Sequence, residues 1–265
     1  MEVVYHPKAD DEVLDSARFY ERRSKGLGWR FLRAVQEAQA PLMRTTVRRQ
    51  EGLMPRRFLL WDHDGVLVDT ERWYFEANRA ALQHLHIDLS EQQYLEIMVA
   101  GRSCWDLARE RQLPETRIDA LRAARDALYQ EFLQTKPIEI EGVAEVLAEL
   151  APHYRMAIIT TARRRDFDLI HARRNLLDHF EFVLTVEDYA RSKPHPDPYL
   201  AGLARFGAQG ADALVIEDSA RGLAAARAAG LDCLIIQNPF TASQDFSGAW
   251  RVVDSVRRVP ELLVP

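Results

Sequence analysis

The sequence has few of the features that mark secreted, membrane-bound or nucleic-acid-binding proteins. Its 265 residues include only two cysteines, Cys104 and Cys233, which lie in different predicted segments without metal-ligand spacing, so we interpret them as reduced structural residues. No apolar run approaches the ~18 residues of a membrane span, and we find no signal peptide. The formal net charge of −5 gives no reason to expect nucleic acid or an anionic membrane as a partner. These absences favour a cytoplasmic protein, in which a local basic pocket could still hold a small anion.

The distribution of apolar residues predicts an α/β fold. Short strand-like runs alternate with helical segments, as in a parallel sheet covered on both faces; the runs are 58–61, 156–160, 182–185, 213–216 and 233–236. Residues 71–150 are almost wholly helical in pattern, which indicates an insertion after the first strand. We therefore expect a Rossmann-like core of residues 56–70 and 151–265, an inserted helical cap of residues 71–150, and an amino-terminal extension of residues 1–52.

Two carboxylates, Asp62 and Asp64, follow the first predicted strand two positions apart. Asp62 is expected at the carboxyl end of this strand, where open α/β sheets bind their ligands, and Gly65 allows a turn sharp enough to bring Asp64 back beside it. An aspartate can attack a phosphoryl group as a nucleophile, while a second carboxyl protonates the leaving alcohol and later deprotonates water. The alternative is an ordinary Asp-Gly turn that ends a strand.

The end of the second predicted strand carries groups suited to holding a phosphate. Thr160, Thr161 and Ala162 come just before an amphipathic helix, where a hydroxyl and free backbone N–H groups can bind phosphate oxygens. A threonine that only caps this helix is an equally good interpretation.

A proline-rich loop at residues 191–200 is the next candidate element. Two prolines rigidify the chain around Lys193, whose ammonium group could neutralise Asp62 and the transferring phosphoryl group. Asp197 is expected to cap the helix that follows, with Pro198 as the first helical residue.

Two adjacent acids, Glu217 and Asp218, end another buried strand. Carboxylates at such a position are costly unless a cation joins them, because burial disfavours an unpaired charge. Oxygen ligands from Asp62, Asp218 and a backbone carbonyl, completed by waters and substrate phosphate, are the set that Mg²⁺ prefers. The sequence therefore predicts a magnesium site.

Together these segments resemble the four motifs of the haloacid dehalogenase (HAD) superfamily of hydrolases, in order and each at or just beyond a strand end. The motifs are Asp62-x-Asp64-Gly65, the hydroxyl of Thr160, Lys193-Pro-His-Pro, and Glu217-Asp218-Ser-x-x-Gly222. The resemblance implies an aspartyl-phosphate enzyme, with Asp62 as nucleophile, Asp64 as general acid/base and metal ligand through its carbonyl, Thr160 as phosphate binder, Lys193 as charge neutraliser, Asp218 as metal ligand, and Glu217 supporting the metal or its waters.

The resemblance also suggests where the substrate is chosen. The helical insert is similar to the family's first type of cap, and its segment 100–103 resembles a loop that dips into the site, so Arg102 is a candidate substrate contact. An aspartate at position 64 favours hydrolysis of a small phosphorylated metabolite over dehalogenation. A sugar phosphomutase of the beta-phosphoglucomutase type is the alternative, and a non-catalytic binding protein is the competing class.

The amino-terminal extension carries a second resemblance. Residues 3–35 are similar to the opening strand and helical hairpin of RelE/ParE-type toxins, but the similarity stops near residue 50, before the strands that would complete that sheet. One strand without a partner cannot form a stable sheet. We therefore interpret the segment as a truncated fusion without toxin activity, in which Phe31, Val35, Ala38 and Leu42 form an apolar stripe.

Overall fold

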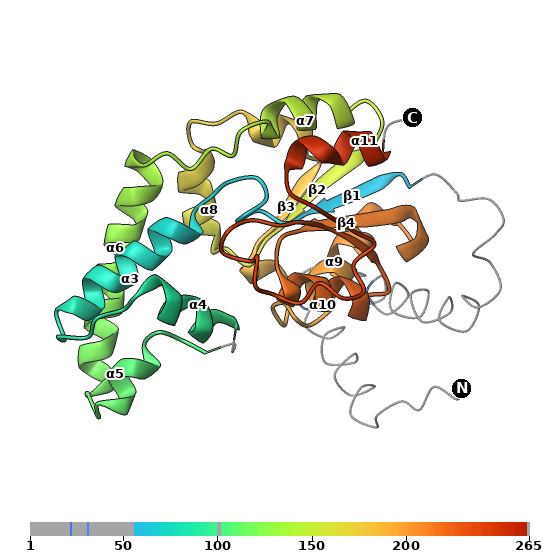
Figure 1. Cartoon of the computed structure of the whole chain (residues 1–265). Helices are drawn as coiled ribbons and strands as arrows, with labels where there is room; N and C mark the ends of the chain where they lie inside the picture. Colours follow the sequence, from blue (N-terminus) through green and yellow to red (C-terminus); the bar gives the residue numbers. More distant parts are fainter. Residues whose placement is uncertain (1–21, 23–30, 32–55, 100–101, 264–265) are drawn as a thin grey trace, which may run out of the picture.

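The computed structural model describes residue 22, residue 31 and residues 56–99 and 102–263. Their centre is a six-stranded, wholly parallel sheet with the strand order β3-β2-β1-β4-β5-β6. The strands are β1 (Phe58–Trp61), β2 (Arg155–Ile159), β3 (Phe182–Leu184), β4 (Ala213–Glu217), β5 (Asp232–Ile236) and β6 (Arg251–Val253). Helices cover the sheet (Figure 1). This architecture confirms the predicted α/β, Rossmann-like fold.

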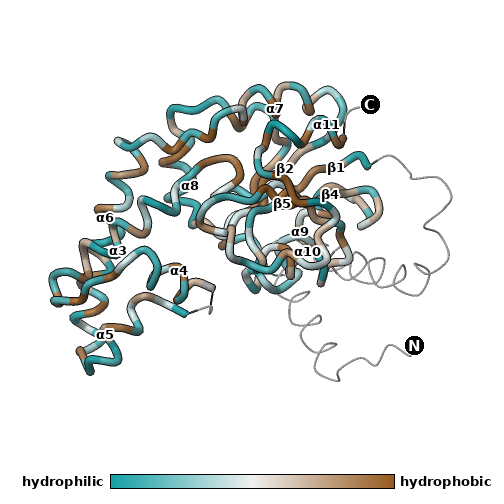
Figure 2. The backbone as a smooth tube through the Cα atoms, viewed as in Figure 1, coloured by the Kyte–Doolittle hydropathy of each residue, from teal (hydrophilic) through white to brown (hydrophobic). Residues whose placement is uncertain are grey.

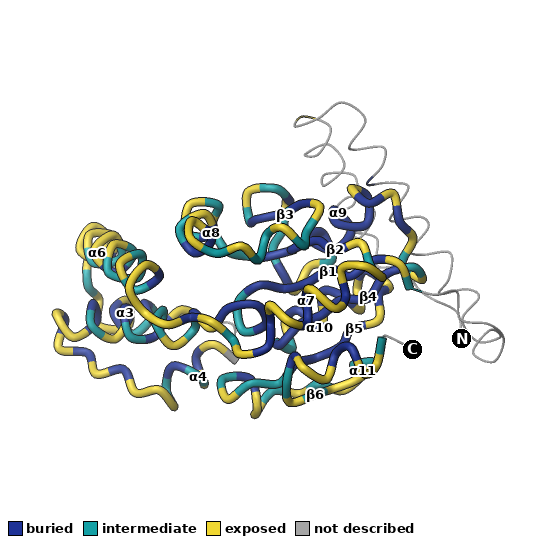
Figure 3. The backbone as a smooth tube through the Cα atoms, turned by 90° about the horizontal axis from the view of Figure 1, so that it is seen from above, coloured by how far each residue is buried: buried dark blue, intermediate teal, exposed yellow. Residues whose placement is uncertain are grey.

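Apolar side chains of the strands fill both faces of the sheet. Successive side chains of a strand point to opposite faces, so Phe58 and Leu60 join one core cluster while Leu59 and Trp61 join the other. The first cluster includes side chains of α9 (Asp197–Phe206) and α10 (Ala220–Ala228), and the second includes those of α7 (Val143–Leu150), α8 (Arg164–His171) and α11 (Val259–Leu263). The most hydrophobic segments accordingly lie along the strands (Figure 2), which are mostly buried (Figure 3).

Four helices form an insert between β1 and β2 that stands to one side of the sheet (Figure 1). They are α3 (Glu71–Gln83), α4 (Glu91–Val99), α5 (Asp106–Glu110) and α6 (Glu115–Thr135). The insert has its own core cluster, which includes Phe75, Tyr94 and Trp105. The next helix, α7, instead packs Val146 and Leu147 against the sheet. We therefore infer that the predicted cap, 71–150, ends before α7.

Strand positions follow the prediction closely, but one strand was missed and one helix begins at a different residue. The strand β6 was not predicted because it has only three residues, two of them exposed. The prediction that Asp197 caps a helix is wrong, since α9 begins at Asp197 itself after Pro196. The Asp197 carboxylate is fully buried and binds the Arg191 guanidinium group at 2.8 Å, a stronger partner than a backbone N–H group.

Most of the amino-terminal extension lies outside the described residues, and so do Val35, Ala38 and Leu42 of its predicted stripe. Phe31 is the exception: it is helical, 1% exposed, and a member of the core cluster that contains Phe58. An aromatic ring of the extension thus packs with the α9 and α10 face of the sheet. No helix in the described parts of the chain is long and apolar enough to cross a membrane.

Candidate active site

The predicted motifs meet at the carboxyl edge of the sheet. β1 lies between β2 and β4: the chain runs from β1 through β2 to β3 on one side, then crosses to β4, β5 and β6 on the other. This reversal of strand order opens a crevice at the carboxyl ends of the strands, as in other open α/β sheets. Asp62 follows β1 and Thr160 follows β2, while Glu217 is the last residue of β4. The backbone N–H of Asp62 donates to the Ile216 carbonyl at 2.8 Å, which fixes Asp62 beside the end of β4 and its last residue, Glu217.

Gly65 turns the chain after β1, and Asp62 and Asp64 on this turn both line one cavity. The φ of Gly65, +79°, is in the left-handed region that favours glycine, and its N–H donates to the Val68 carbonyl at 2.7 Å. The Asp64 carboxylate accepts a hydrogen bond from the Thr70 N–H at 3.0 Å. Burial, reinforced by the charge of Glu71, raises the pKa of Asp64 to about 7. A carboxyl with this pKa is suited to exchange protons near neutral pH.

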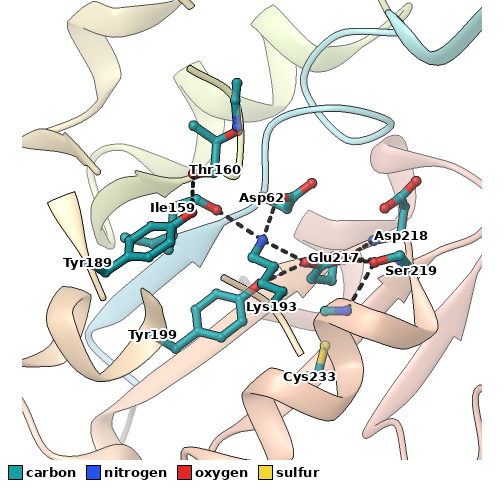
Figure 4. A network of polar contacts seen from close by, with 12 residues as sticks. Asp62, Ile159, Thr160, Tyr189, Lys193, Tyr199, Glu217, Asp218, Ser219 and Cys233 are labelled. Carbon is teal, nitrogen blue, oxygen red and sulfur yellow. Dashed lines mark hydrogen bonds and ion pairs between the residues drawn. The ribbon is translucent and has the colours of Figure 1, made fainter. Parts of the chain in front are cut away.

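Lys193 places a buried positive charge beside Asp62. Its ammonium group donates to Asp62 Oδ1, to the Ile159 carbonyl at 3.0 Å and to Glu217 Oε1 at 2.8 Å (Figure 4). Burial alone would lower the pKa of Lys193, but the carboxylates of Asp62 and Glu217 outweigh it and raise the pKa. Burial raises the pKa of Asp62 to about 7 against the lowering influence of Lys193. The lysine therefore stays charged and neutralises this corner of the site.

Asp218, which follows Glu217 in the chain, is 9% exposed. Its Oδ2 accepts a hydrogen bond from the Asn238 side-chain amide at 2.8 Å, while burial and the charges of Glu217, Asp62 and Asp64 raise its pKa well above the usual range. Carboxylate oxygens of Asp62, Glu217 and Asp218 lie within 4.8 Å of one another. Hard oxygen donors crowded at this spacing fit a divalent cation such as Mg²⁺, because its charge would offset their repulsion.

The loop after β2 is organised differently from a helix cap. Helix α8 begins at Arg164, after Arg163, so the interpretation of Thr160 as its cap is wrong. Thr160 is 2% exposed, and its Oγ1 accepts a hydrogen bond from the Ala162 N–H at 3.0 Å. The Ala162 donor is thus already used within the loop, while Thr161 lines the cavity beside the acids.

A cavity of about 620 Å³ opens over these groups and is bounded by the core and the insert. The predicted residues along it are Asp62, Asp64, Arg102, Thr161, Lys193, Glu217 and Asp218; Thr160 and Ala162 are not in the described lining. Arg102 is half-exposed and paired with Glu110 at 2.6 Å. The cavity also has an apolar side formed by Leu95, Met98 and Phe240.

Sequence reasoning missed two polar residues of this edge. Asn238 follows β5 and binds Asp218, and Tyr199 of α9 donates to Glu217 Oε1 at 2.9 Å. The rule that ligands gather beyond strand ends could have singled out Asn238, which comes two residues after Ile236. No comparable signal marks Tyr199, because the pattern of an apolar helix predicts a core residue at this position and no polar role.

Known proteins resemble the chain over most of its length. A family model described as haloacid dehalogenase-like hydrolase matches residues 59–236. Protein CbbY of Rhodobacter capsulatus is 31% identical over 226 residues, which are 79% of this chain and 100% of that protein. The fructose-1-phosphate phosphatase YqaB of Escherichia coli (strain K12) is 28% identical over 185 residues, covering 68% of this chain and 95% of that protein. A crystal structure of CbbY from Rhodobacter sphaeroides in complex with phosphate has a TM-score of 0.65 at 24% identity, covering 77% of this chain and 96% of that one.

The sheet, its acidic edge and these matches define an enzyme of the α/β class. The chain belongs to the haloacid dehalogenase-like hydrolase family, because the family model covers more than half of it and CbbY of R. capsulatus exceeds 30% identity. The matched range, 59–236, leaves the amino-terminal extension outside. These relatives lend no support to its resemblance to RelE/ParE-type toxins.

Proposed function

We propose that the chain is a Mg²⁺-dependent phosphatase that hydrolyses a small phosphorylated metabolite through an aspartyl-phosphate. One observation carries the proposal: Asp62 is held at the floor of the cavity by the buried ammonium group of Lys193, with the second carboxyl, Asp64, two residues away on a glycine turn. A nucleophile, a charge neutraliser and a proton donor are thereby supplied at one edge of the sheet.

The reaction takes two displacements. In the first, an oxygen of Asp62 bonds to phosphorus while the phosphorus–oxygen bond of the ester breaks, and the neutral carboxyl of Asp64 gives its proton to the departing alcohol. In the second, the carboxylate of Asp64 takes a proton from water, which bonds to phosphorus and releases Asp62 and inorganic phosphate. Lys193 offsets the charge on the transferring group throughout. Burial and the charge of Glu71 raise the pKa of Asp64, which favours the protonated carboxyl that the first displacement needs.

Mg²⁺ would be held by the carboxylates of Asp62 and Asp218 and the backbone carbonyl of Asp64, where it would polarise phosphoryl oxygens. The remaining predicted contacts belong to the substrate. Thr161, which lines the cavity, would bind the phosphate, while Thr160 and Ala162 would shape its loop through their own hydrogen bond. Arg102 of the insert would contact the leaving group. The cap would exclude bulk water in the first step and admit one water in the second.

The substrate class is a small phosphorylated metabolite, most simply a sugar phosphate. The name of the related fructose-1-phosphate phosphatase YqaB supports this class, as does the phosphate complex of the similar CbbY structure. The cavity of about 620 Å³ has room for more than a phosphate, and beyond the acids it offers hydroxyl and amide groups from Thr241, Ser243 and Gln244. Such groups can bind sugar hydroxyls.

The test is release of inorganic phosphate from a panel of sugar phosphates and para-nitrophenyl phosphate. Activity should require Mg²⁺, disappear with excess EDTA and return when Mg²⁺ is restored. Asp62→Asn serves as the inactive control. A phosphomutase would instead convert a sugar 1-phosphate to its 6-phosphate without net phosphate release, which phosphorus NMR distinguishes. No phosphate release from any ester would contradict the proposal.

A further inference from the structure

Tyr199 lies directly behind the lysine and the acid that organise the site. Its side chain is fully buried in α9, and its hydroxyl donates to Glu217 Oε1 at 2.9 Å. The ammonium group of Lys193 donates to the same oxygen at 2.8 Å and stands 4.9 Å from the centre of the Tyr199 ring (Figure 4). The tyrosine therefore touches Lys193 through its ring face and through the shared carboxylate oxygen.

The carboxylate of Glu217 is saturated with protein donors. Its Oε1 accepts from Lys193 and Tyr199, while its Oε2 accepts from the Asp218 N–H at 3.0 Å and from the Ser219 N–H and hydroxyl at 3.0 and 2.9 Å. These five donors exceed the roughly four lone-pair positions of a carboxylate. Helix α10 closes the remaining side, since a Cβ on Gly222 would overlap the carboxyl group.

We propose that Tyr199 is a positioning residue that keeps Glu217 bound to Lys193 and away from the metal, so that Glu217 orients the lysine instead of serving as a ligand. This inference rests on the proposed phosphatase function. It assigns the metal to Asp62, Asp218 and the Asp64 carbonyl alone. The hydroxyl of Tyr199 then helps, through Glu217, to fix the position of the Lys193 ammonium group, and this group offsets charge in the transition state.

If Tyr199 acts through Glu217 on Lys193, its removal should lower turnover without weakening Mg²⁺ binding. If Glu217 were a metal ligand, both would change together. Without the Tyr199 hydroxyl, Glu217 loses a donor on the oxygen that anchors Lys193, so the ammonium group is less well placed over the transferring phosphoryl group. Because the transition state carries more charge there than the bound substrate, turnover should fall while substrate binding is kept. The metal ligands are unchanged, so Mg²⁺ binding should be kept as well.

The experiment compares Tyr199→Phe with the wild-type protein and with Tyr154→Phe. The control also removes one tyrosine hydroxyl, which donates to the Leu263 carbonyl at 2.5 Å, away from the cavity. Calorimetry on the metal-free full-length proteins measures the Mg²⁺ affinity. Steady-state kinetics with para-nitrophenyl phosphate measure kcat and KM. We expect Tyr199→Phe to lower kcat about tenfold, with KM and the Mg²⁺ Kd within about twofold, and Tyr154→Phe to change none of the three.

Two results would overturn the inference: a kcat of Tyr199→Phe within twofold of the wild type, or a Mg²⁺ Kd weakened about tenfold together with kcat. If Tyr199→Phe does not fold, Glu217→Gln takes its place, because an amide keeps the shape of the carboxylate and weakens the anchor of Lys193. Here kcat should fall while the Mg²⁺ Kd stays within about twofold, and a Kd weakened about tenfold would overturn the inference. A wild-type protein without phosphatase activity would overturn the proposed function itself, which separates the two failures.

Discussion

The α-carbon of Gly65 faces the carboxyl group of Asp218 so closely that a Cβ on residue 65 would lie 2.7 Å from Asp218 Cγ. The turn that carries Asp64 is thus packed against the acid that follows β4. Glycine is required twice at this position, because its φ of +79° disfavours any side chain and because there is no space for one. The two halves of the proposed metal site are therefore in close contact, the backbone of Gly65 against the side chain of Asp218.

Gly65→Ala should displace Asp218 and weaken Mg²⁺ binding by at least about tenfold, measured by calorimetry on the metal-free protein. Gly207→Ala is a matched control: its φ is +65°, but no atom lies within 4 Å of the added Cβ. Both variants should lose about 1 kcal/mol of unfolding free energy from backbone strain, and only Gly65→Ala should also lose metal affinity. Equal Mg²⁺ affinities in the two variants would contradict the argument.

Asp62→Asn should reduce kcat by on the order of 10⁴ or more, because an amide cannot replace a covalent nucleophile and only positioning remains. The loss should leave the fold intact, since asparagine keeps the shape of the side chain and can still bond to the neighbouring lysine. Steady-state kinetics and circular dichroism check the two parts. More than about a tenth of wild-type kcat would exclude Asp62 as the nucleophile.

Asp64→Ala should affect substrates according to their leaving groups. Alkyl phosphates need a proton on the departing oxygen, whereas para-nitrophenolate leaves without one, so the loss in kcat should be much larger for sugar phosphates. The comparison is made with one enzyme preparation on both substrates. Equal losses would show that Asp64 acts mainly through the turn or the metal.

A buried pair of histidines should make the protein sensitive to acid. Nε2 of His63 and Nε2 of His171 lie 2.8 Å apart, and burial lowers the pKa of His171 to about 4. An unfolded histidine has a pKa of about 6.5, so the unfolded chain binds the extra proton between these values. The contribution of His171 to stability is therefore complete above pH 6.5 and is lost as the pH falls toward 4.

His171→Gln should reduce this sensitivity, because an amide does not titrate. Between pH 6.5 and 4 the unfolding free energy of the wild type should fall more steeply than that of the variant, by at most about 1.4 kcal/mol per pH unit. Urea unfolding at several pH values measures both slopes. His153→Gln, at an exposed position, is the control. Parallel curves for wild type and His171→Gln would refute the assignment.

Local patterns predicted the sheet well because each central strand is a short apolar run. The limits of β1, Phe58–Trp61, agree with the expectation at both ends, and β4 differs only by the added Glu217. The same reasoning could not find β6, where Arg251 and Val252 are exposed and only Val253 is partly buried. An edge strand with so little apolar burial has no distinct period.

Site residues that come just after a strand could be predicted from the sequence. Contacts between residues far apart along the chain could not. Asp62, Lys193 and Asp218 were found from their places after strands or in a rigid loop, and the structure brings all three to one cavity. Other contacts around the site join residues that are far apart along the chain: Tyr199 is 18 residues from Glu217, and His171 is 108 residues from His63. Such pairs depend on how helices pack on the sheet, which periodicity alone does not encode.

Phe31 links the amino-terminal extension to the stability of the enzyme. Its ring is 1% exposed in the cluster on the α9 and α10 face, and it does not line the cavity in the described structure. Phe31→Ala should therefore lower the unfolding free energy by about 3–5 kcal/mol, the usual cost of removing a buried aromatic ring. Leu262→Ala, at a side chain 39% exposed, should cost under about 1 kcal/mol.

Activity should respond differently from stability when the extension is removed. A chain beginning at Pro55 retains every group proposed for the chemistry, so its kcat/KM at low temperature should stay within about threefold of the full chain, or roughly 0.7 kcal/mol of transition-state stabilisation. Its melting temperature should fall, because the face that Phe31 covers becomes exposed to water. Thermal melts and phosphate release on the same samples measure both. A large loss of kcat/KM in a folded, Mg²⁺-binding sample would show instead that the extension shapes the active site.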